Sequence, residues 1–189
     1  MKNRIIQVAA QAMNERGTKF TVDTVAQRLG ISKKTLYQYV SSKEELIHLI
    51  VDVALGDVHS QQTEILHSNK TLVEKLTSVL TSQPHIFGPI NDWIFDDIKN
   101  SCPAAWDDIE EFRRSRAQVV IDLLEEGKAS GEIRSINSPI AAQALHGALR
   151  EMFDYGFLTS ANLTFKDAMS GCVDLLIHGM LKSGGENLE

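Results

Sequence analysis

Residues 22–41 read VDTVAQRLGISKKTLYQYVS, and this stretch decides the fold of the N-terminal part of the chain. Ala26 is small enough to let two helices cross closely. Gly30 stands where the turn between those helices needs a positive φ, which glycine adopts without steric cost. The apolar positions predicted to hold the crossing together are Val25, Leu29, Ile31 and Leu36. The stretch therefore predicts a helix-turn-helix.

The second helix of this pair is predicted to carry a polar and aromatic outer face. Its members are Lys33, Lys34, Thr35, Tyr37, Gln38 and Tyr39. Hydrogen-bond donors and aromatic rings suit phosphates and base edges, and one helix is slim enough for a major groove. The alternative is a packed helical hairpin with no partner. The small alanine, the turn glycine, the apolar positions and the polar face together favour a nucleic-acid reader.

The rest of the chain shows helical periodicity without sustained alternation of period two. We expect Thr21 and Ser32 to cap the two helices of the pair, and residues 42–45 to open a long helix with a capping box. The predicted fold is all-α, with an N-terminal three-helix domain and a C-terminal helical bundle that dimerises. About nine helices are expected. The first ends at Gly17, and the long one that starts at 103 ends near 126–127 or near 130–131. The others are expected at residues 22–29, 33–40, 43 to beyond 60, 72–80, 88–99, 138–158 and 165–182.

Charge separates the N-terminal quarter from the remainder of this 189-residue chain, whose formal net charge is −6. Residues 1–48 carry 8 Lys and Arg against 4 Asp and Glu, a balance of +4, and the remainder has a balance of −10. Only the N-terminal quarter could therefore attract phosphates. We predict a DNA-binding domain over residues 1–48, an effector-binding and dimerisation domain over 49–184, and a tail over 185–189.

Composition excludes several classes of protein. A hydrophobic content of 43% is too high for a wholly disordered chain. No apolar run approaches the roughly 20 residues of a membrane-spanning helix, and the start of the chain lacks a signal-peptide core. Cys102 and Cys172 make no CxxC pair, which suits a reducing compartment. We expect a cytoplasmic protein with no membrane partner.

Residues 1–51 resemble the DNA-binding domain of the TetR family of bacterial transcriptional regulators. The matching segments are residues 5–10, Gly17, and residues 20–21, 25–26, 29–32, 35–37 and 42–46. The resemblance implies an all-α homodimer that binds an operator of two-fold symmetry and, in many members, releases it when a small ligand enters the C-terminal domain. Thr18 and Val40 depart from the pattern, where aromatic residues are common. We expect Phe20 to supply the first missing ring and Val40 still to fill the core.

The matching positions suggest roles at the DNA. Base-edge candidates are Lys33, Thr35 and Gln38, with Lys34 as a further one. Phosphate candidates are Thr21, Tyr39 and Lys43, and Tyr37 is expected to touch either a phosphate or a thymine methyl. Repression is the common mode of the family, and the sequence leaves activation open.

Two later segments carry broad apolar faces that one domain could bury internally. The first comprises Ala141, Ala144, Leu145, Ala148, Leu149 and Met152, and the second Cys172, Val173, Leu176, Ile177, Met180 and Leu181. The resemblance implies instead that these helices pair with their symmetry mates in a four-helix bundle. A homodimer would also supply the second reading helix that an operator needs.

The C-terminal part is expected to hold a small apolar or amphipathic effector. Candidate contacts are His85, Trp93, Phe95, His146, Glu151 and Phe153. The acidic balance of this region points to a cationic effector, and the alternative is that the aromatic residues are simply core.

Two other functions stay open as alternatives. One is an interaction protein that keeps the fold without reading DNA or responding to a ligand, and the other is a helical-bundle enzyme. The six histidines show no HExxH spacing, and no P-loop, GxSxG or dinucleotide-binding glycine pattern is present. We therefore expect no enzymatic activity, no catalytic residue, no metal site and no cofactor.

Overall fold

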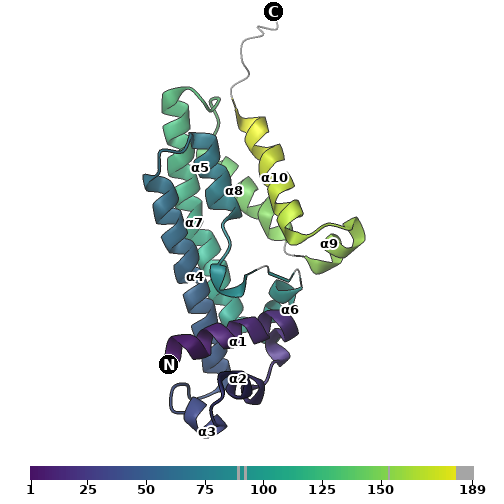
Figure 1. The fold of residues 1–189 in the computed structure, drawn as a ribbon. Helices are drawn as coiled ribbons and strands as arrows, with labels where there is room; N and C mark the ends of the chain where they lie inside the picture. Colours follow the sequence, from purple (N-terminus) through teal and green to yellow (C-terminus); the bar gives the residue numbers. More distant parts are fainter. Residues whose placement is uncertain (89, 92, 153, 182–189) are drawn as a thin grey trace, which may run out of the picture. The chain divides into compact units, whose positions relative to one another are not determined.

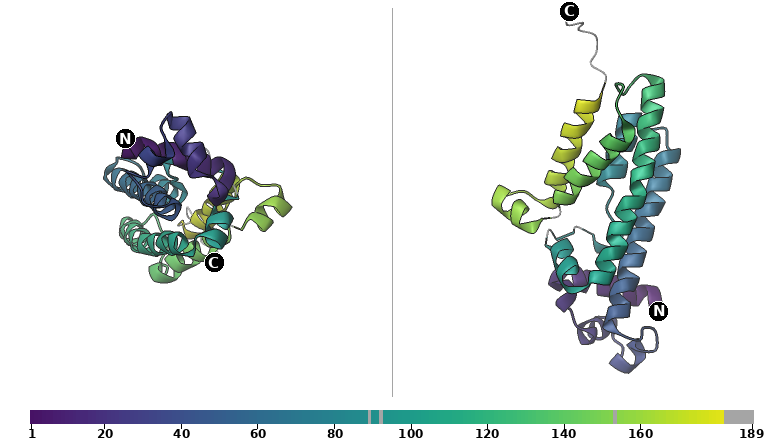
Figure 2. Two further views of the ribbon diagram at one scale, coloured as in Figure 1. Left: turned by 90° about the horizontal axis from the view of Figure 1, so that it is seen from below. Right: turned by 180° about the vertical axis from the view of Figure 1, so that it is seen from behind.

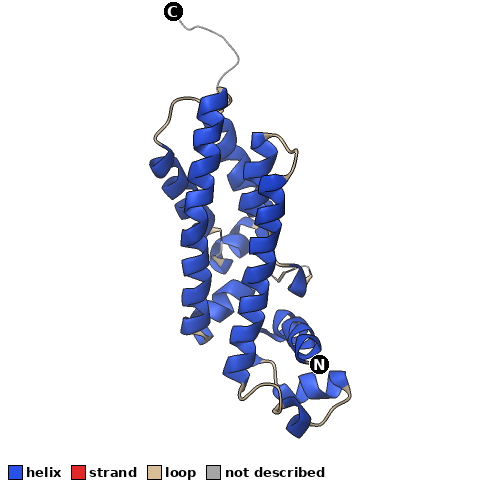
Figure 3. Cartoon of the chain, turned by 90° about the vertical axis from the view of Figure 1, so that its left-hand side faces the viewer, coloured by secondary structure: helices blue, strands red, loops and turns tan. Residues whose placement is uncertain are grey.

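The computed structural model describes residues 1–88, 90–91, 93–152 and 154–181, and helices dominate them (Figures 1 and 3). Phe153 and the predicted tail at 185–189 lie outside the described residues. The α-helices there are α1 Lys2–Arg16, α2 Val22–Leu29, α3 Lys33–Leu36, α4 Lys43–His67, α5 Leu72–Thr81, α6 Ile94–Ser101, α7 Pro103–Ser130, α8 Ser138–Glu151, α9 Tyr155–Ala161 and α10 Phe165–Met180. Two 3-10 turns, η1 Gly17–Lys19 and η2 His85–Phe87, complete the elements. The predicted all-α class is confirmed.

The chain forms two compact units, which we describe separately. Unit 1 comprises Met1–Ser60 and Gln83–Glu111, and unit 2 comprises Gln61–Ser82 and Phe112–Glu189. The long helices α4 and α7 each contribute residues to both units. The boundary expected after residue 48 separates functions rather than packing units, and it stays a prediction.

Unit 1 is built around α1, whose apolar stripe faces a continuous core. Ile5 and Met13 are fully buried there with Phe20, and Val40 is 2% exposed. The expectation that Val40 fills the core is therefore confirmed, and the Phe20 ring lies inside the same cluster. Apolar residues of α6 and α7 join this cluster, among them Ile94 and Ile109.

In unit 2, α10 packs against α5 and α8 (Figure 2). Fully or almost fully buried side chains from each of the main helices form its core, namely Leu76, Val79, Leu124, Leu145, Val173 and Ile177. Arg134 links the segment after α7 to the end of α10, because its Nε donates to the carbonyl of Gly179 at 3.0 Å. No described helix is both long enough and apolar enough to span a bilayer.

Local capping explains where the helices depart from the expected boundaries. The segment expected as one helix over 138–158 is two, because Asp154 caps a new start by accepting from the N–H of Phe157 at 2.6 Å. Asn162, at φ 53°, ends α9, and Thr164 caps α10. The helix expected from residue 88 begins only at Ile94, since Gly88, at φ 65°, ends the turn η2. Ten helices therefore stand in the described part of the chain, one more than expected.

Candidate nucleic-acid interface

The turn between α2 and α3 has the geometry that the sequence predicts. Thr21 caps α2, its hydroxyl accepting from the N–H of Thr24 at 3.1 Å. Gly30 adopts φ 68° and ψ 30°, and the N–H of Ile31 donates to the carbonyl of Ala26 at 3.1 Å. This pairing across a left-handed residue is a Schellman motif. It gives hydrogen-bond donors to backbone carbonyls at the end of α2 and turns the chain toward α3.

Helix α3, Lys33–Leu36, is shorter than the helix expected over residues 33–40. Ser32 caps it, since its hydroxyl accepts from the N–H of Thr35 at 3.0 Å. Beyond Leu36 the hydrogen bonds tighten to a spacing of three residues: the N–H of Gln38 donates to Thr35 at 3.2 Å, and that of Tyr39 donates to Leu36 at 2.9 Å. One α-helical turn therefore continues as tighter turns.

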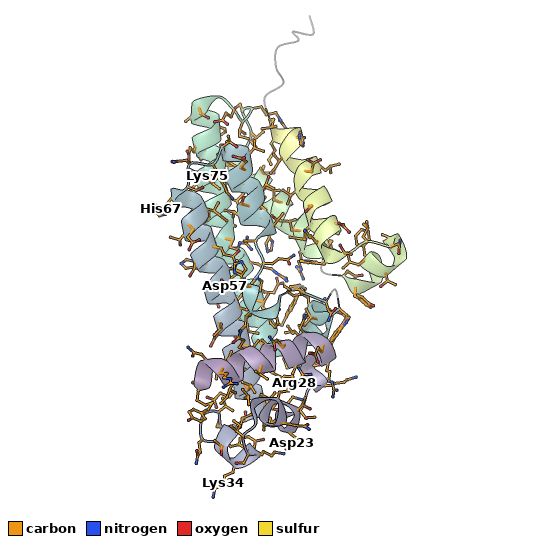
Figure 4. The ribbon with its side chains drawn as sticks, in the orientation of Figure 1. Asp23, Arg28, Lys34, Asp57, His67 and Lys75 are labelled. Carbon is orange, nitrogen blue, oxygen red and sulfur yellow. The ribbon has the colours of Figure 1, made fainter. Side chains whose placement is uncertain are left out.

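One buried residue anchors this segment while its neighbours face outward. Leu36 is fully buried, whereas Tyr37 is 42% exposed and Tyr39 is 39% exposed. The side chains of Lys33, Lys34 and Gln38 are exposed, and that of Thr35 is half-buried. Figure 4 shows Lys34 pointing away from α3 and from the rest of unit 1. Five of the six side chains expected on the outer face are therefore exposed.

Salt bridges already involve part of this surface. Lys33 Nζ lies 2.9 Å from Asp23 Oδ2 on α2, and this carboxylate raises the pKa of Lys33. Arg28 binds Glu15 through both carboxylate oxygens, at 3.0 and 2.5 Å, which ties α2 to α1. Both pairs are largely exposed, so they orient side chains more than they stabilise the fold.

The start of α4 places a lysine over the Phe20 ring. Ser42 Oγ accepts from the N–H of Glu45 at 3.0 Å, and the Glu45 carboxylate accepts from the backbone N–H and, at 2.6 Å, the hydroxyl of Ser41. The expected capping box is thus present with its return contact shifted by one residue. These bonds lower the pKa of Glu45. Lys43 opens the helix, and its Nζ lies 5.3 Å from the centroid of the Phe20 ring.

Comparison with known proteins identifies this arrangement. Residues 5–50 match the family described as "Bacterial regulatory proteins, tetR family". The N-terminal domain is a TetR-family DNA-binding domain.

Similarity to known transcriptional regulators extends over nearly the whole length of this chain. It is 27% identical over 182 residues to the uncharacterized HTH-type transcriptional regulator YvaF of Bacillus subtilis, covering 95% of each chain. A TetR transcriptional regulator of Chloroflexus aurantiacus has the same fold, with a TM-score of 0.72, 17% identity and 95% of both chains covered. FadR of Bacillus subtilis, solved with stearoyl-CoA, gives a TM-score of 0.66 at 20% identity, covering 95% of this chain and all of that one.

The residues expected to contact an effector are divided between the two units of the chain. In unit 1, His85 is exposed with Nδ1 3.2 Å from Asp57 Oδ1, Trp93 covers Gly17, and Phe95 packs against the core. In unit 2, His146 and Glu151 both belong to α8, and Glu151 is exposed.

A pocket within unit 2 includes one of these candidates, His146. Helices α5, α7, α8 and α10 line it, and it encloses about 520 Å³ of space including its open mouth. Three arginines missed by the sequence reasoning also line it: Arg113, Arg116 and Arg150. Helical spacing could have found them, because Arg113 and Arg116 lie one turn apart and His146 precedes Arg150 by four residues.

Metal binding has no candidate site in the part of the chain that is described. There, no group of three His, Cys, Asp or Glu side chains lies close enough to hold a metal ion.

Proposed function

We propose that this protein is a cytoplasmic transcriptional repressor that binds a palindromic operator as a homodimer and releases it when a small effector binds. The observation that carries the proposal is the left-handed turn at Gly30, which presents an exposed polar face on α3 while Leu36 anchors the helix in the core. An exposed helix held rigidly in this way suits insertion into a major groove.

Side chains of α3 and of the turn that follows it are proposed to read base edges, with Lys34 as a further candidate. Lys33 can donate to guanine, Gln38 can bond adenine through two hydrogen bonds, and the Thr35 methyl can meet a thymine methyl. Thr35 Oγ1 already lies 2.8 Å from the capping Ser32 Oγ, which favours the methyl as its contact. To contact a base, Lys33 must leave its ion pair with Asp23 and bind the DNA instead. In the absence of DNA, Asp23 orients the Lys33 ammonium.

Flanking side chains are proposed to hold the phosphates. Thr21 caps α2, Tyr39 follows α3 and Lys43 opens α4. Tyr37 is a further contact, to a phosphate or to a thymine methyl. Lys43 lies in the first turn of α4, whose N-terminus also favours an anion. Phosphate contacts of this kind set orientation and affinity, whereas base contacts set sequence preference.

Dimerisation is proposed through the outer face of α8 and α10. Five of the twelve residues in the predicted apolar stripes are buried within unit 2, including Leu145, Val173 and Ile177. A shallow groove beside them, here called the dimer face, is lined by Ile140, Ala141, Ala144, Leu175 and Gly179. Of these, only Ala141 and Ala144 belong to the predicted stripes. Ile140 is 67% exposed and Leu175 is 73% exposed, and small neighbours allow close approach of a second copy.

An effector response is supported by the relatives. The structure of FadR holds stearoyl-CoA, and KstR2 of Mycolicibacterium smegmatis, 25% identical over 138 residues, is a repressor. The unit 2 pocket is the proposed effector site in this chain.

Selection of genomic DNA fragments by the purified protein tests DNA reading. Fragments retained at low salt should share an inverted repeat whose half-sites lie about 34–36 Å apart. The matched variant Lys33→Ala/Gln38→Ala changes only exposed side chains and should lose that enrichment. If the wild-type protein retains no fragment, or if the wild type and the double variant retain the same fragments, the alternative of an interaction protein is favoured.

A further inference from the structure

We infer that the unit 2 pocket binds an amphipathic anion, with the negatively charged head at Arg113, Arg116 and His146 and an apolar body along α5 and α10. The inference rests on the proposed function only in taking this pocket as the effector site. It adds the chemical class of the effector and the residues of this chain that recognise its charge.

The charged side chains that line the pocket are all positive. Arg113, Arg116 and Arg150 line it, and no Asp or Glu is among the lining residues. The rest of the chain beyond residue 48 is strongly acidic, with 21 acidic against 11 basic residues. A local reversal of charge inside a concave site favours an anion. It is also opposite to the cationic effector expected from the overall charge.

Arg116 is the most informative of these groups. Its Nη2 donates to Ser82 Oγ at 3.1 Å, and its guanidinium lies 5.8 Å from the centroid of the Phe112 ring. Burial lowers the pKa of Arg116 to about 10, and no carboxylate among the described residues opposes that effect. The Arg116 guanidinium stays charged at neutral pH, and it contacts the Ser82 hydroxyl and the Phe112 ring. A desolvated cation of this kind is stabilised when an anion joins it.

His146 supplies a second polar atom. Its Nε2 is buried without a hydrogen-bond partner among the described residues, although the side chain lines the pocket. Buried polar atoms in native proteins nearly always have a partner, which a bound molecule can provide. A carboxylate or phosphate oxygen would accept a hydrogen bond from this ring nitrogen and from a neighbouring arginine.

The remaining lining is hydrocarbon. Leu80 of α5, Val120 of α7, Leu149 of α8 and Met169 of α10 provide apolar walls. A ligand that carries only charge would leave these walls in contact with water, whereas one with an alkyl or ring body would cover them. A lining that combines cationic and hydrocarbon side chains therefore favours an amphipathic anion.

The test compares head groups on one alkyl chain, using the full-length protein without DNA. Octanoate, octyl phosphate, octan-1-ol and octylamine are titrated below their micellar concentrations and followed by thermal shift and calorimetry. We expect octanoate or octyl phosphate to bind, and the stronger of the two assigns the head as carboxylate or phosphate. Binding of octanol or octylamine equal to that of both anions, or binding of none of the four, would overturn the inference.

A pair of variants on α7 then locates the charge contact. Arg116→Gln should weaken binding of the anion by about tenfold or more, as expected for loss of a charged hydrogen bond. Arg114→Gln is the matched control, because Arg114 is exposed and does not line the pocket. Arg150→Gln provides a second pocket variant at an exposed position if Arg116→Gln folds poorly. Equal affinity of the pocket variants and the control would reject these contacts.

Operator binding is measured on the same samples. If the protein binds operator but none of the anions, the ligand class is wrong and the repressor proposal stands. If no operator is found while octanoate binds in the Arg116-dependent manner, the pocket chemistry stands and the repressor proposal fails.

Discussion

Leu36 and Gln38 stand two positions apart in the sequence and face opposite environments. Leu36 is fully buried in the core of unit 1, and Gln38 is exposed. The spacing of apolar residues alone predicts this division, because a side chain's direction along a helical turn follows from its position. The ion pair between Lys33 and Asp23 was not predicted, since it depends on how α2 and α3 cross.

Gln38→Ala should change sequence preference more than overall affinity. We expect a loss of about 1–3 kcal/mol on the cognate site and relaxation at one base position. Selection from a randomised half-site library measures this. Gln11→Ala, which removes an exposed glutamine of α1, is the control, and an unchanged preference in Gln38→Ala would contradict the role in base reading.

Lys43→Ala should weaken binding to all sequences alike. Loss of one phosphate contact should flatten the slope of log affinity against log salt by about one unit. Lys99→Ala is a matched control, since Lys99 also lies over an aromatic ring, 6.0 Å from the centroid of Trp106. Titrations at several salt concentrations in which both variants keep the wild-type slope would exclude a phosphate contact for Lys43.

At the scale of elements, local signals placed the starts of helices better than their ends. Residues such as Thr21 and Ser32 cap their own helices as expected, because the bonded partner lies three residues away in the sequence. The ends at Glu151 and Leu36 were missed. They depend on where a competing cap or a tighter turn takes over, and apolar periodicity does not record that.

The cap of α4 predicts a pH dependence. Hydrogen bonds from Ser41 place the pKa of Glu45 below its ordinary value of 4.5. Because the pKa is lower in the folded chain, ionised Glu45 stabilises it above that value, and the contribution is lost as the pH falls through the folded-state pKa. Urea unfolding should therefore show Glu45→Gln less stable than wild type at pH 7, with a difference that shrinks as the pH falls below 4.5.

Glu64→Gln is the control for that measurement, because it removes an exposed carboxylate from the same helix. A stability difference between Glu45→Gln and wild type that persists unchanged at pH 3 would contradict the account.

Gly17, the first residue of η1, packs closely against Trp93 and Asp97, and its replacement should lower the stability of the fold. It adopts φ 64°, and a Cβ would collide with the Asp97 carboxylate and lie 2.7 Å from Trp93 Cζ3. The N–H of Thr18 donates to the same carboxylate at 2.5 Å. Backbone strain and overpacking together predict that Gly17→Ala lowers the free energy of unfolding by about 3 kcal/mol.

Gly30→Ala is the milder comparison. Gly30 has φ 68° and ψ 30°, in the left-handed helical region, and a Cβ there meets no atom within 4 Å. Gly17 has ψ −159°, a conformation that is essentially confined to glycine. We therefore expect Gly30→Ala to lose only about 1 kcal/mol in denaturant unfolding. Equal losses in the two variants would contradict the larger cost expected at Gly17.

At the scale of the whole molecule, dimerisation decides whether one short reading segment can select an operator. The dimer face retains large exposed apolar side chains after each unit has buried its own core. Family resemblance predicted which helices pair, whereas the burial of Leu145 and Ile177 decided which of their faces remains available.

Leu175→Arg should convert the protein to a monomer, because a charge at the centre of an apolar interface is desolvated without a partner. Sedimentation velocity at micromolar concentration measures this, and operator affinity should fall with the loss of the second reading helix. Leu163→Arg is the matched control for Leu175→Arg, because Leu163 is 40% exposed and lies outside the dimer face. A dimeric Leu175→Arg variant would place the interface elsewhere.

The sequence by itself determined the features whose partners lie within one or two helical turns. These are the helix-turn-helix, its left-handed glycine, the polar face of α3 and the caps that begin the helices. Short-range sterics and hydrogen bonds fix such features wherever the segment is placed. Only the tertiary structure decided the contact between Thr18 and Asp97, 79 residues apart, and the gathering of Arg113, Arg116 and His146 around one pocket. Those depend on how separate helices pack, and a pattern along one chain segment does not contain that information.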